Sequence, residues 1–161
     1  MLKNSDELNG MRVAGKLAAE VLEMITEYVK PGISTGELDE ICFKYITDVQ
    51  KAIPANVGYR GFEKTLCTSI NQVICHGIPD TNRILKSGDI MNIDVTVIKD
   101  GWHGDTSKMF LIGKAQSHNE RLVRVTQECL YKGIEAARPG ARLGDIGNAI
   151  LRLWSLITDR L

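Results

Sequence analysis

A predicted β-hairpin constrains the fold of this chain more than any other feature of its sequence. The run Ile90–Ile98 is rich in β-branched residues, which favour strands. It is followed by Asp100-Gly101, a dipeptide typical of the type I′ turn that joins two antiparallel strands. Trp102–Ile112 then returns as the partner strand. The fold must therefore contain an antiparallel sheet.

Helical patterns lie on both sides of this hairpin. Apolar residues recur at helical spacing over Ser5–Val29, and a Pro-Gly pair at residues 31–32 ends the pattern. Ser34-Thr35-Gly36-Glu37 is typical of a capping box, which opens a second helix. Beyond the hairpin, the sequence predicts a helix over Asn119–Ala137 and a last amphipathic segment from Leu143 to the end.

The segments between the second helix and the hairpin have weaker patterns. Lys51–Lys64 contains proline and glycines and little periodicity, so we expect a loop with some extended structure. Leu66–His76 alternates weakly and is predicted to be a strand. Helices, then antiparallel strands, then helices indicate an α+β fold, an antiparallel β-sheet flanked by helices. With no repeat or linker, residues 1–161 are predicted to form a single domain.

Composition excludes several classes of protein. Twenty Lys and Arg balance twenty Asp and Glu, so no basic field is available to attract nucleic acid or anionic lipid. No apolar run approaches the roughly 20 residues of a membrane-spanning helix. The polar N-terminus lacks the apolar segment of a signal peptide. We therefore expect a cytoplasmic protein that binds neither membranes nor nucleic acid directly.

The hairpin register brings two carboxylates together. With Asp100-Gly101 as the loop, Thr96 faces Asp105, and side chains alternate between the faces of a strand. Asp94 and Asp105 then share one face as diagonal neighbours, with their Cα atoms about 7–8 Å apart. Two converging carboxylates can bind or bridge divalent metal ions, although an isolated strand aspartate more often faces solvent, caps a turn or pairs with a cation. A register slip of one residue would separate them.

Three histidines and four cysteines are weaker candidates. His76, beside a turn, could ligate metal, act as acid or base, or satisfy a turn hydrogen bond. His103 shares the face of Asp105 and could also ligate, whereas His118 is predicted to lie exposed at a helix start. Cys42, Cys67, Cys75 and Cys129 form no C-x-x-C pair, so a structural zinc site is not expected and each is interpreted as a small buried thiol.

Several ordered motifs resemble the bacterial type 1 methionine aminopeptidases, a metallopeptidase family. The resemblance begins with MRVAG at residues 11–15 and VKPGISTGELD at residues 29–39. It is stronger in CTSINQVICHGIP at residues 67–79, and strongest in GDIMNIDV at residues 88–95 and DGWHGDTS at residues 100–107. It covers about residues 10–150, the N-terminal portion of such an enzyme, and leaves residues 151–161 as a divergent tail.

The resemblance implies a partial pita-bread fold and hydrolytic removal of the initiator methionine from nascent proteins. In this family two divalent metal ions (Co²⁺, Mn²⁺, Fe²⁺ or Zn²⁺) are held by two aspartates, one histidine and two glutamates. Asp94 and Asp105 match the two aspartates, and His103 has no ligand role. His76 matches a catalytic histidine that contacts the substrate near the scissile amide.

The resemblance also assigns a methionine pocket. Tyr59, Phe62 and Cys67 match positions that line it. Two positions depart from the usual pattern, because Phe62 replaces a common tyrosine and Asn56 stands where a cysteine is frequent. The implied partner is the N-terminal methionine of nascent peptides, including ribosome-associated ones.

The matching residues stop before the expected histidine ligand and both glutamates. The acidic residues after Asp105 fall in helical patterns, and none matches a family ligand. We therefore expect weak metal binding, a truncated chain that is weakly active or inactive, and marginal stability with self-association. Two alternatives stay open: a half-enzyme completed by a separate C-terminal half, and a non-catalytic protein that binds peptides or a protein partner.

Overall fold

The computed structural model describes residues 4–158, apart from the side chains of residues 156–158. Its contacts fall into two compact units, Met1–Ala115 and Gln116–Leu161, and each unit is described separately below. The division follows the loop between the hairpin and the last two helices. The single-domain organisation stays a prediction.

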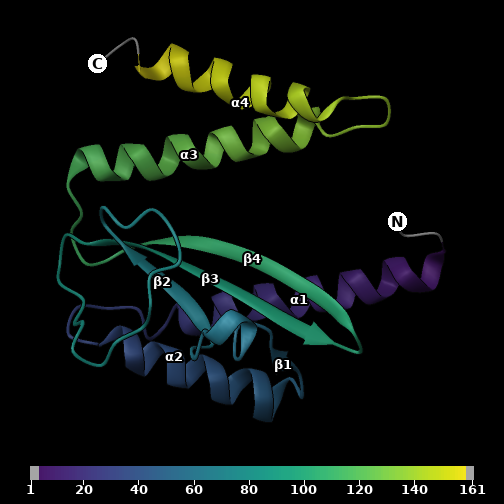
Figure 1. The fold of residues 1–161 in the computed structure, drawn as a ribbon. Helices are drawn as coiled ribbons and strands as arrows, with labels where there is room; N and C mark the ends of the chain where they lie inside the picture. The colour runs from purple at the N-terminus through teal and green to yellow at the C-terminus, as the bar shows by residue number, and fades with distance from the viewer. Residues whose placement is uncertain (1–3, 159–161) are drawn as a thin grey trace. The chain divides into compact units, whose positions relative to one another are not determined.

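The first unit is an antiparallel sheet covered by helices on one face (Figure 1). Its strands are β1 (Ile53–Pro54), β2 (Leu66–Ile70), β3 (Ile90–Lys99) and β4 (Trp102–Leu111), with β3 paired to all the others. Helices α1 (Ser5–Ile25) and α2 (Thr35–Lys44) contribute further core residues, and the segments outside these helices and strands add Ile46, Ala52, Leu85 and Ile112. The predicted α+β class is confirmed.

The hairpin of β3 and β4 has the predicted register. Lys99 pairs with Trp102, and Thr96 pairs with Asp105. Asp100 and Gly101 both have positive φ, 51° and 83°, as a type I′ turn requires. The sequence prediction for this element is therefore confirmed in both turn type and register.

The first two helices begin where the sequence predicts. The Asn4 side chain caps α1 by accepting a hydrogen bond from the Glu7 N–H at 2.9 Å. At α2, Ser34 Oγ accepts from the Glu37 N–H, and the Glu37 carboxylate accepts in return from the Ser34 N–H, which completes the capping box. Helix α1 ends at Ile25, four residues before the predicted end, and α2 continues into the π-helical turn Tyr45–Val49.

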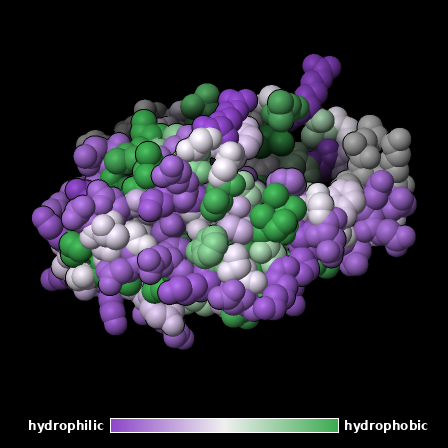
Figure 2. Space-filling view, turned by 60° about the horizontal axis from the view of Figure 1, so that its bottom comes forward, coloured by the Kyte–Doolittle hydropathy of each residue, from purple (hydrophilic) through white to green (hydrophobic). Residues whose placement is uncertain are grey.

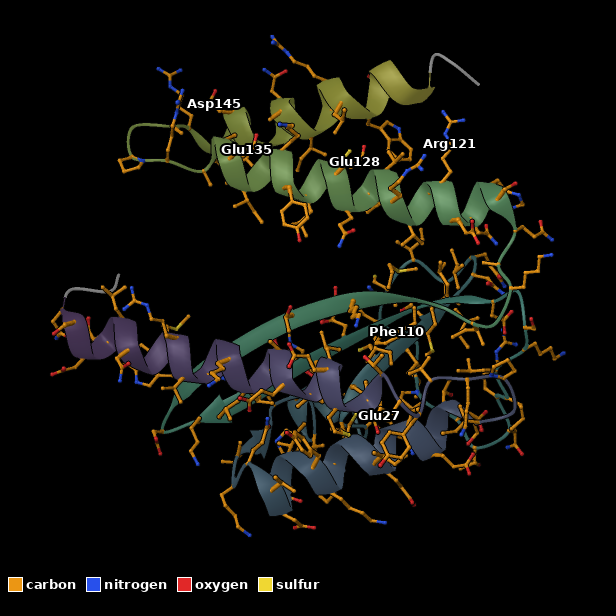
Figure 3. The ribbon with its side chains drawn as sticks, turned by 180° about the vertical axis from the view of Figure 1, so that it is seen from behind. Glu27, Phe110, Arg121, Glu128, Glu135 and Asp145 are labelled. Carbon is orange, nitrogen blue, oxygen red and sulfur yellow. The ribbon has the colours of Figure 1, made fainter. Side chains whose placement is uncertain are left out.

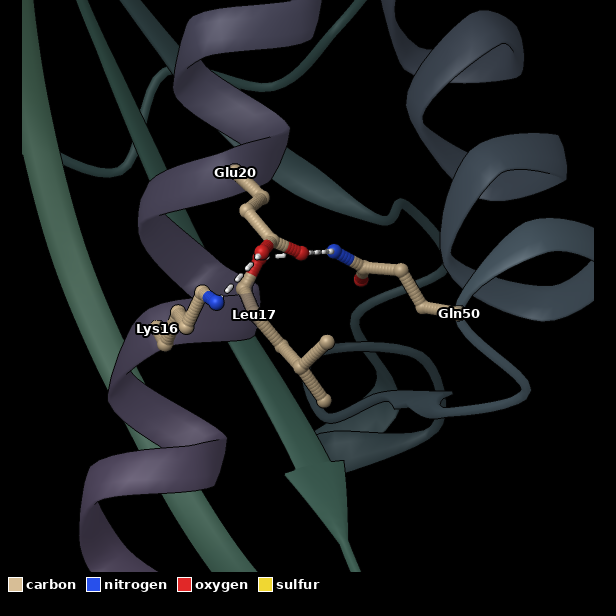
Figure 4. A network of polar contacts seen from close by, with 4 residues as sticks. All are labelled: Lys16, Leu17, Glu20 and Gln50. Carbon is tan, nitrogen blue, oxygen red and sulfur yellow. Dashed lines mark hydrogen bonds and ion pairs between the residues drawn. The ribbon is translucent and has the colours of Figure 1, made fainter.

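A buried amide joins α1 to the chain just after this π-helical turn (Figure 4). Gln50 Nε2 donates to the Leu17 carbonyl at 2.8 Å and lies 3.5 Å from the Glu20 carboxylate, which also pairs with Lys16. A buried side-chain amide requires partners, because an unpaired polar group costs free energy away from water. This network therefore ties the second helical region to α1.

Close backbone approach holds α1 against β4. A Cβ atom on Gly104 would lie only 2.0 Å from the Ala14 carbonyl oxygen. Only glycine fits at this crossing, because no side chain could occupy that space without moving the helix. The position of α1 over the sheet thus depends on a glycine next to Asp105.

The predicted strand Leu66–His76 is too long. Strand β2 ends at Ile70, and the next residue, Asn71, has φ +53°. The Asn71 side chain accepts from the Ile90 N–H and donates to Asp89, so the chain turns here. It then folds back until the Gly77 carbonyl accepts from the Thr68 N–H at 2.7 Å. The weak alternation beyond Ile70 therefore belongs to a loop.

The second unit is a pair of helices, α3 (Ser117–Ala136) and α4 (Leu143–Thr158). They pack through Gly133, where a Cβ would meet side-chain atoms of Ile146 and Ile150. Helix α3 begins two residues before the predicted start. Residues 151–158 of the predicted divergent tail continue α4, and residues 159–161 lie outside the described part of the chain.

Exposed apolar side chains are scattered over the first unit. Figure 2 shows such residues as separate groups among polar ones on the face it presents. The tip of the loop after β2 is the extreme case, since Ile74 is 94% exposed. In the described part of the chain, no helix is long and apolar enough to cross a membrane.

The cysteines do not all follow the prediction. Cys42, Cys67 and Cys129 are buried free thiols, as expected. Cys75 is exposed, so its predicted burial is wrong. The cause is the same turn at Asn71, which takes the chain out of the sheet before it reaches Cys75.

Candidate functional site

One pocket in the first unit gathers all the side chains that the sequence predicted for the site. Its volume is about 630 Å³. It is lined by Asn56, Tyr59, Arg60, Gly61, Phe62, Cys67, His76, Ile78, Asp94, Thr96 and Asp105. Segments far apart in the sequence thus meet on the face of the sheet opposite the helical core.

The two aspartates stand on neighbouring strands at the floor of this arrangement. Asp94 pairs with Ser107 and Thr96 with Asp105, so the two carboxylates are diagonal neighbours, as predicted. The pKa of the Asp94 carboxyl is raised, first by burial, then by the negative charge of Asp105 and a hydrogen bond with it. The His76 side chain opposes this shift. A cation between the carboxylates would relieve the same repulsion.

Cys67 faces this pair from the adjacent strand, because it is the register partner of Asp94. Burial, followed by the negative charge of Asp94, raises the pKa of the Cys67 thiol to about 11. The thiol therefore stays protonated at neutral pH, which disfavours it as a nucleophile. A protonated, polarisable thiol suits a wall that contacts an apolar ligand.

A buried carboxylate on α2 fixes the start of β2. Asp39 Oδ1 accepts hydrogen bonds from the N–H groups of Thr65 and Leu66 at 2.8 and 3.1 Å. Burial raises the pKa of Asp39 despite these bonds. Since Cys67 follows directly, Asp39 helps to determine where the thiol enters the pocket.

The aromatic wall comes from a short turn in the predicted loop. Tyr59–Gly61 forms one turn of 3-10 helix, and the Gly58 N–H donates to the Phe62 carbonyl at 2.8 Å. Asn56 Nδ2 donates to the Thr65 carbonyl at 3.2 Å, which links this turn to the strand that carries Cys67. Asn56, noted above as a departure from the family pattern, thus has a structural contact here.

Four pocket residues, Arg60, Gly61, Ile78 and Thr96, were not predicted as site residues from the sequence. Each is adjacent in the chain to, or two positions from, a predicted site residue, and that proximity is the available signal. Arg60 is the most informative of the four, because it is a charged residue between two aromatic pocket residues. Sequence periodicity offers no indication of which loop side chains line a pocket.

His76 reaches the pocket from a loop rather than from a strand end. Its φ of +56° lies in the left-handed region, where histidine is found more often than most residues. Its position corrects the predicted strand but keeps His76 beside Asp94. His103 is exposed and does not line the pocket, and His118 is exposed in the first turn of α3, as predicted.

Three carboxylates of the second unit, labelled in Figure 3, have partners within that unit. Glu128 pairs with Arg124 and Glu135 with Lys132, while Asp145 accepts from the Arg142 N–H. Within residues 4–158, no group of three or more His, Cys, Asp or Glu side chains is placed to hold a metal ion. Asp94 and Asp105 thus fit a divalent cation as oxygen ligands but form only part of a coordination shell.

Comparison with known proteins identifies a family and several relatives that match most of this chain. The model of metallopeptidase family M24 matches residues 9–155, five residues further than the predicted limit of 150. The methionine aminopeptidase of Salmonella typhimurium is 62% identical over 149 residues, which cover 92% of this chain. The Rickettsia prowazekii methionine aminopeptidase is 56% identical over 140 residues, 87% of the chain.

Solved structures agree. The crystal structure of the Rickettsia prowazekii enzyme superposes with a TM-score of 0.92 at 52% identity, covering 95% of this chain and 61% of that one. The Thermotoga maritima methionine aminopeptidase superposes with a TM-score of 0.93 at 30% identity, covering 98% of this chain and 63% of that one. A prolidase from Pyrococcus furiosus is only 16% identical but superposes with a TM-score of 0.81, so it shares the fold.

The chain spans little more than half the length of these curated relatives, 56% of the Salmonella protein and 53% of the Rickettsia protein. Over that length it has the fold of the matching part of the pita-bread methionine aminopeptidases. Family M24 consists of metallopeptidases, in agreement with the paired aspartates. The chain belongs to metallopeptidase family M24 and is homologous to the N-terminal portion of bacterial methionine aminopeptidases.

Proposed function

We propose that this chain carries the methionine pocket and part of the dinuclear metal site of a methionine aminopeptidase, a hydrolase of N-terminal methionine on nascent peptides. One observation carries the proposal. A single pocket brings an aromatic and thiol wall, formed by Tyr59, Phe62 and Cys67, together with the Asp94–Asp105 pair. An aminopeptidase needs both elements, one for the side chain and one for the reacting amide.

Each part of the pocket has a distinct task in this proposal. The aromatic rings and the protonated Cys67 thiol contact the thioether side chain of methionine, since sulfur and aromatic groups attract one another. His76 contacts the peptide near the scissile amide. Asp94 and Asp105 hold the divalent metal (Co²⁺, Mn²⁺, Fe²⁺ or Zn²⁺), which when bound lowers the pKa of a water and polarises a carbonyl.

Turnover by the chain alone should be slight. Two carboxylates leave most coordination positions to water, and such sites bind divalent ions weakly. The described residues bring neither a histidine ligand nor glutamates to the pair. A separate C-terminal half could supply them, and self-association is a second route by which the chain could meet a partner surface.

Isothermal titration with Co²⁺ or Mn²⁺, followed by hydrolysis of Met-Gly-Ser-Met, tests the proposal. We expect weak metal binding that Asp105→Ala removes and that Asp48→Ala, an exposed carboxylate outside the pocket, leaves unchanged. Addition of a C-terminal segment of a relative should raise turnover. Metal binding that survives Asp105→Ala would refute the assignment of the site.

A non-catalytic peptide-binding role is the second candidate, and one observation favours it. The methionine wall is built from hydrogen-bonded backbone and from β2, and none of these contacts needs a metal. Binding of Met-Gly-Ser-amide in the presence of EDTA, without hydrolysis after both metal and the C-terminal segment of a relative are added, would support this role. Hydrolysis on metal addition would favour the enzyme.

A further inference from the structure

The pocket contains one cation that the proposed function does not use. Arg60 lies in the turn Tyr59–Gly61 and lines the pocket together with the aromatic wall. Its guanidinium carbon is 5.5 Å from the centroid of the Tyr59 ring, within the range of a cation–π contact. Arg60 is therefore held on the wall by its neighbour, although its side chain is exposed.

The guanidinium of Arg60 has no carboxylate partner within the described chain. The ion pairs found there use other cations: Lys16, Lys44, Arg124 and Lys132. Glu63 stands three positions away in the sequence, yet it forms no ion pair with Arg60. The planar donors of Arg60 thus stay available to a ligand, and their geometry matches a carboxylate.

The backbone under Arg60 is strained. Its φ of 51° and ψ of 32° lie in the left-handed region, which arginine seldom adopts. Gly58 and Gly61, on either side, also have positive φ, 85° and 83°. Hydrogen bonds from the Gly58 N–H to the Phe62 carbonyl and from the Phe62 N–H to the Tyr59 carbonyl close the turn around this conformation. Strain of this kind clusters at ligand-binding sites, where surrounding structure maintains it.

Charge is separated within the pocket. Asp94 and Asp105 supply negative charge, and Arg60 is the one Lys or Arg among the lining residues. A peptide carries a carboxylate downstream of its N-terminal methionine, and Arg60 is the lining side chain whose charge complements it. Opposite charges placed in this way orient a ligand and select against neutral ones.

We propose that Arg60 is a specificity-determining residue that binds a carboxylate of the peptide downstream of its N-terminal methionine. This inference rests on the proposed function. The carboxylate has two sources, the C-terminus of a short peptide or an acidic side chain, and both present the same chemistry to the guanidinium.

Calorimetric binding of matched peptides to the whole chain, with and without Mn²⁺, tests this assignment. The terminal source is measured by Met-Gly-Ser against Met-Gly-Ser-amide. The side-chain source is measured by Met-Gly-Glu-amide against Met-Gly-Gln-amide. For at least one pair, the carboxylate form should bind about two- to fivefold more tightly, the range that a solvent-exposed charge pair contributes.

Two variants remove the charge. Arg60→Gln should bring the ratio for that pair close to one, and Arg60→Gly should do the same in a turn whose positive φ suits glycine. Arg83→Gln, an exposed arginine outside the pocket, is the matched control and should leave the ratio unchanged. Ratios that persist in both Arg60 variants, or that equal one in the wild-type chain, would overturn the assignment.

A third pair separates failure of this inference from failure of the proposed function. Met-Gly-Ser-amide against Gly-Gly-Ser-amide reports on the methionine wall and contains no carboxylate. Equal affinities for these two peptides would count against the methionine pocket. The affinity ratios of the two carboxylate pairs would still test the role of Arg60. Absence of binding by every peptide would reject both.

Discussion

The two faces of strand β3 differ in chemistry although their residues alternate along ten positions. One face carries Met91, Ile93, Val95 and Val97, all with no exposed surface. The other carries Asn92, Asp94, Thr96 and Ile98, all half-buried. Helices α1 and α2 complete the core on the first face, and the pocket lies on the second.

This difference separates stability from ligand binding. Burial of apolar surface on the core face stabilises the unit. The pocket face places Asp94 near Asp105, where burial and like charge oppose ionisation. Because a strand alternates its faces at every residue, stabilising and destabilising side chains can be neighbours in sequence without contacting each other.

The largest effect should follow from a cavity on the core face. Ile93→Ala removes a fully buried side chain from the centre of the cluster and should lower the free energy of unfolding by about 2–5 kcal/mol. Ile98→Ala, on the half-buried face of the same strand, should cost less. Urea unfolding measures both, and equal losses would break the contrast between the faces.

Contact between α1 and the sheet comes next. In Gly104→Ala the new Cβ would meet the Ala14 carbonyl, so we expect a loss of about 1–3 kcal/mol by overpacking. Gly15→Ala is the matched control, because nothing lies within 4 Å of its Cβ position. Because alanine favours the helix more than glycine does, this control should raise the free energy of unfolding by about 0.5–1 kcal/mol. Thermal unfolding of both variants should give opposite signs.

The helix cap that begins α2 should have a smaller effect. Ser34→Ala removes the hydrogen bond to the Glu37 N–H and should cost about 1 kcal/mol. Hydrogen bonds from the Ser34 N–H and hydroxyl lower the pKa of Glu37. The cap therefore stabilises the fold above the ordinary pKa of glutamate, and this contribution is lost as pH falls through the lowered value.

Melting temperatures of the wild-type chain and of Ser34→Ala, measured from neutral pH to below pH 4, test this cap. The wild-type advantage should shrink on acidification. An advantage that stays constant with pH would mean that Glu37 contributes nothing to the cap.

The smallest effect, of opposite sign, is expected on the pocket face. The pKa of Asp94 in the folded chain is raised above its ordinary value of 3.8. The carboxyl therefore stabilises the fold while it is protonated, and this stabilisation is lost as pH rises through the raised pKa. Asp94→Asn cannot ionise. At neutral pH and without metal it should match or exceed the wild-type stability, by less than about 1 kcal/mol because solvent screens the pair.

Urea unfolding at pH 3 and pH 7 measures this difference for Asp94→Asn. The stability advantage of the variant over the wild-type chain at pH 7 should disappear at pH 3. A clear loss of stability at pH 7 would show that the aspartate pair stabilises the fold, which would reverse the contrast drawn between the two faces.

Local signals predicted the elements whose geometry is determined by nearby residues. The Asp100-Gly101 turn and the Ser34–Glu37 capping box are such cases, since both close within a few residues. The end of β2 was missed, because it depends on hydrogen bonds between Asn71 and residues 89 and 90. The outward position of Cys75 follows from that same long-range contact.

For the candidate site, the sequence by itself determined the Asp94–Asp105 pair, because pleat and turn register follow from chain geometry alone. Tertiary structure decided which loop residues share the pocket with this pair. Arg60 and His76 both adopt positive φ in irregular segments, where no periodicity indicates the direction of a side chain. A hydrogen bond from Asn56 to Thr65 places the first of these loops and one from Thr68 to Gly77 places the second, and such contacts exist only in the folded chain.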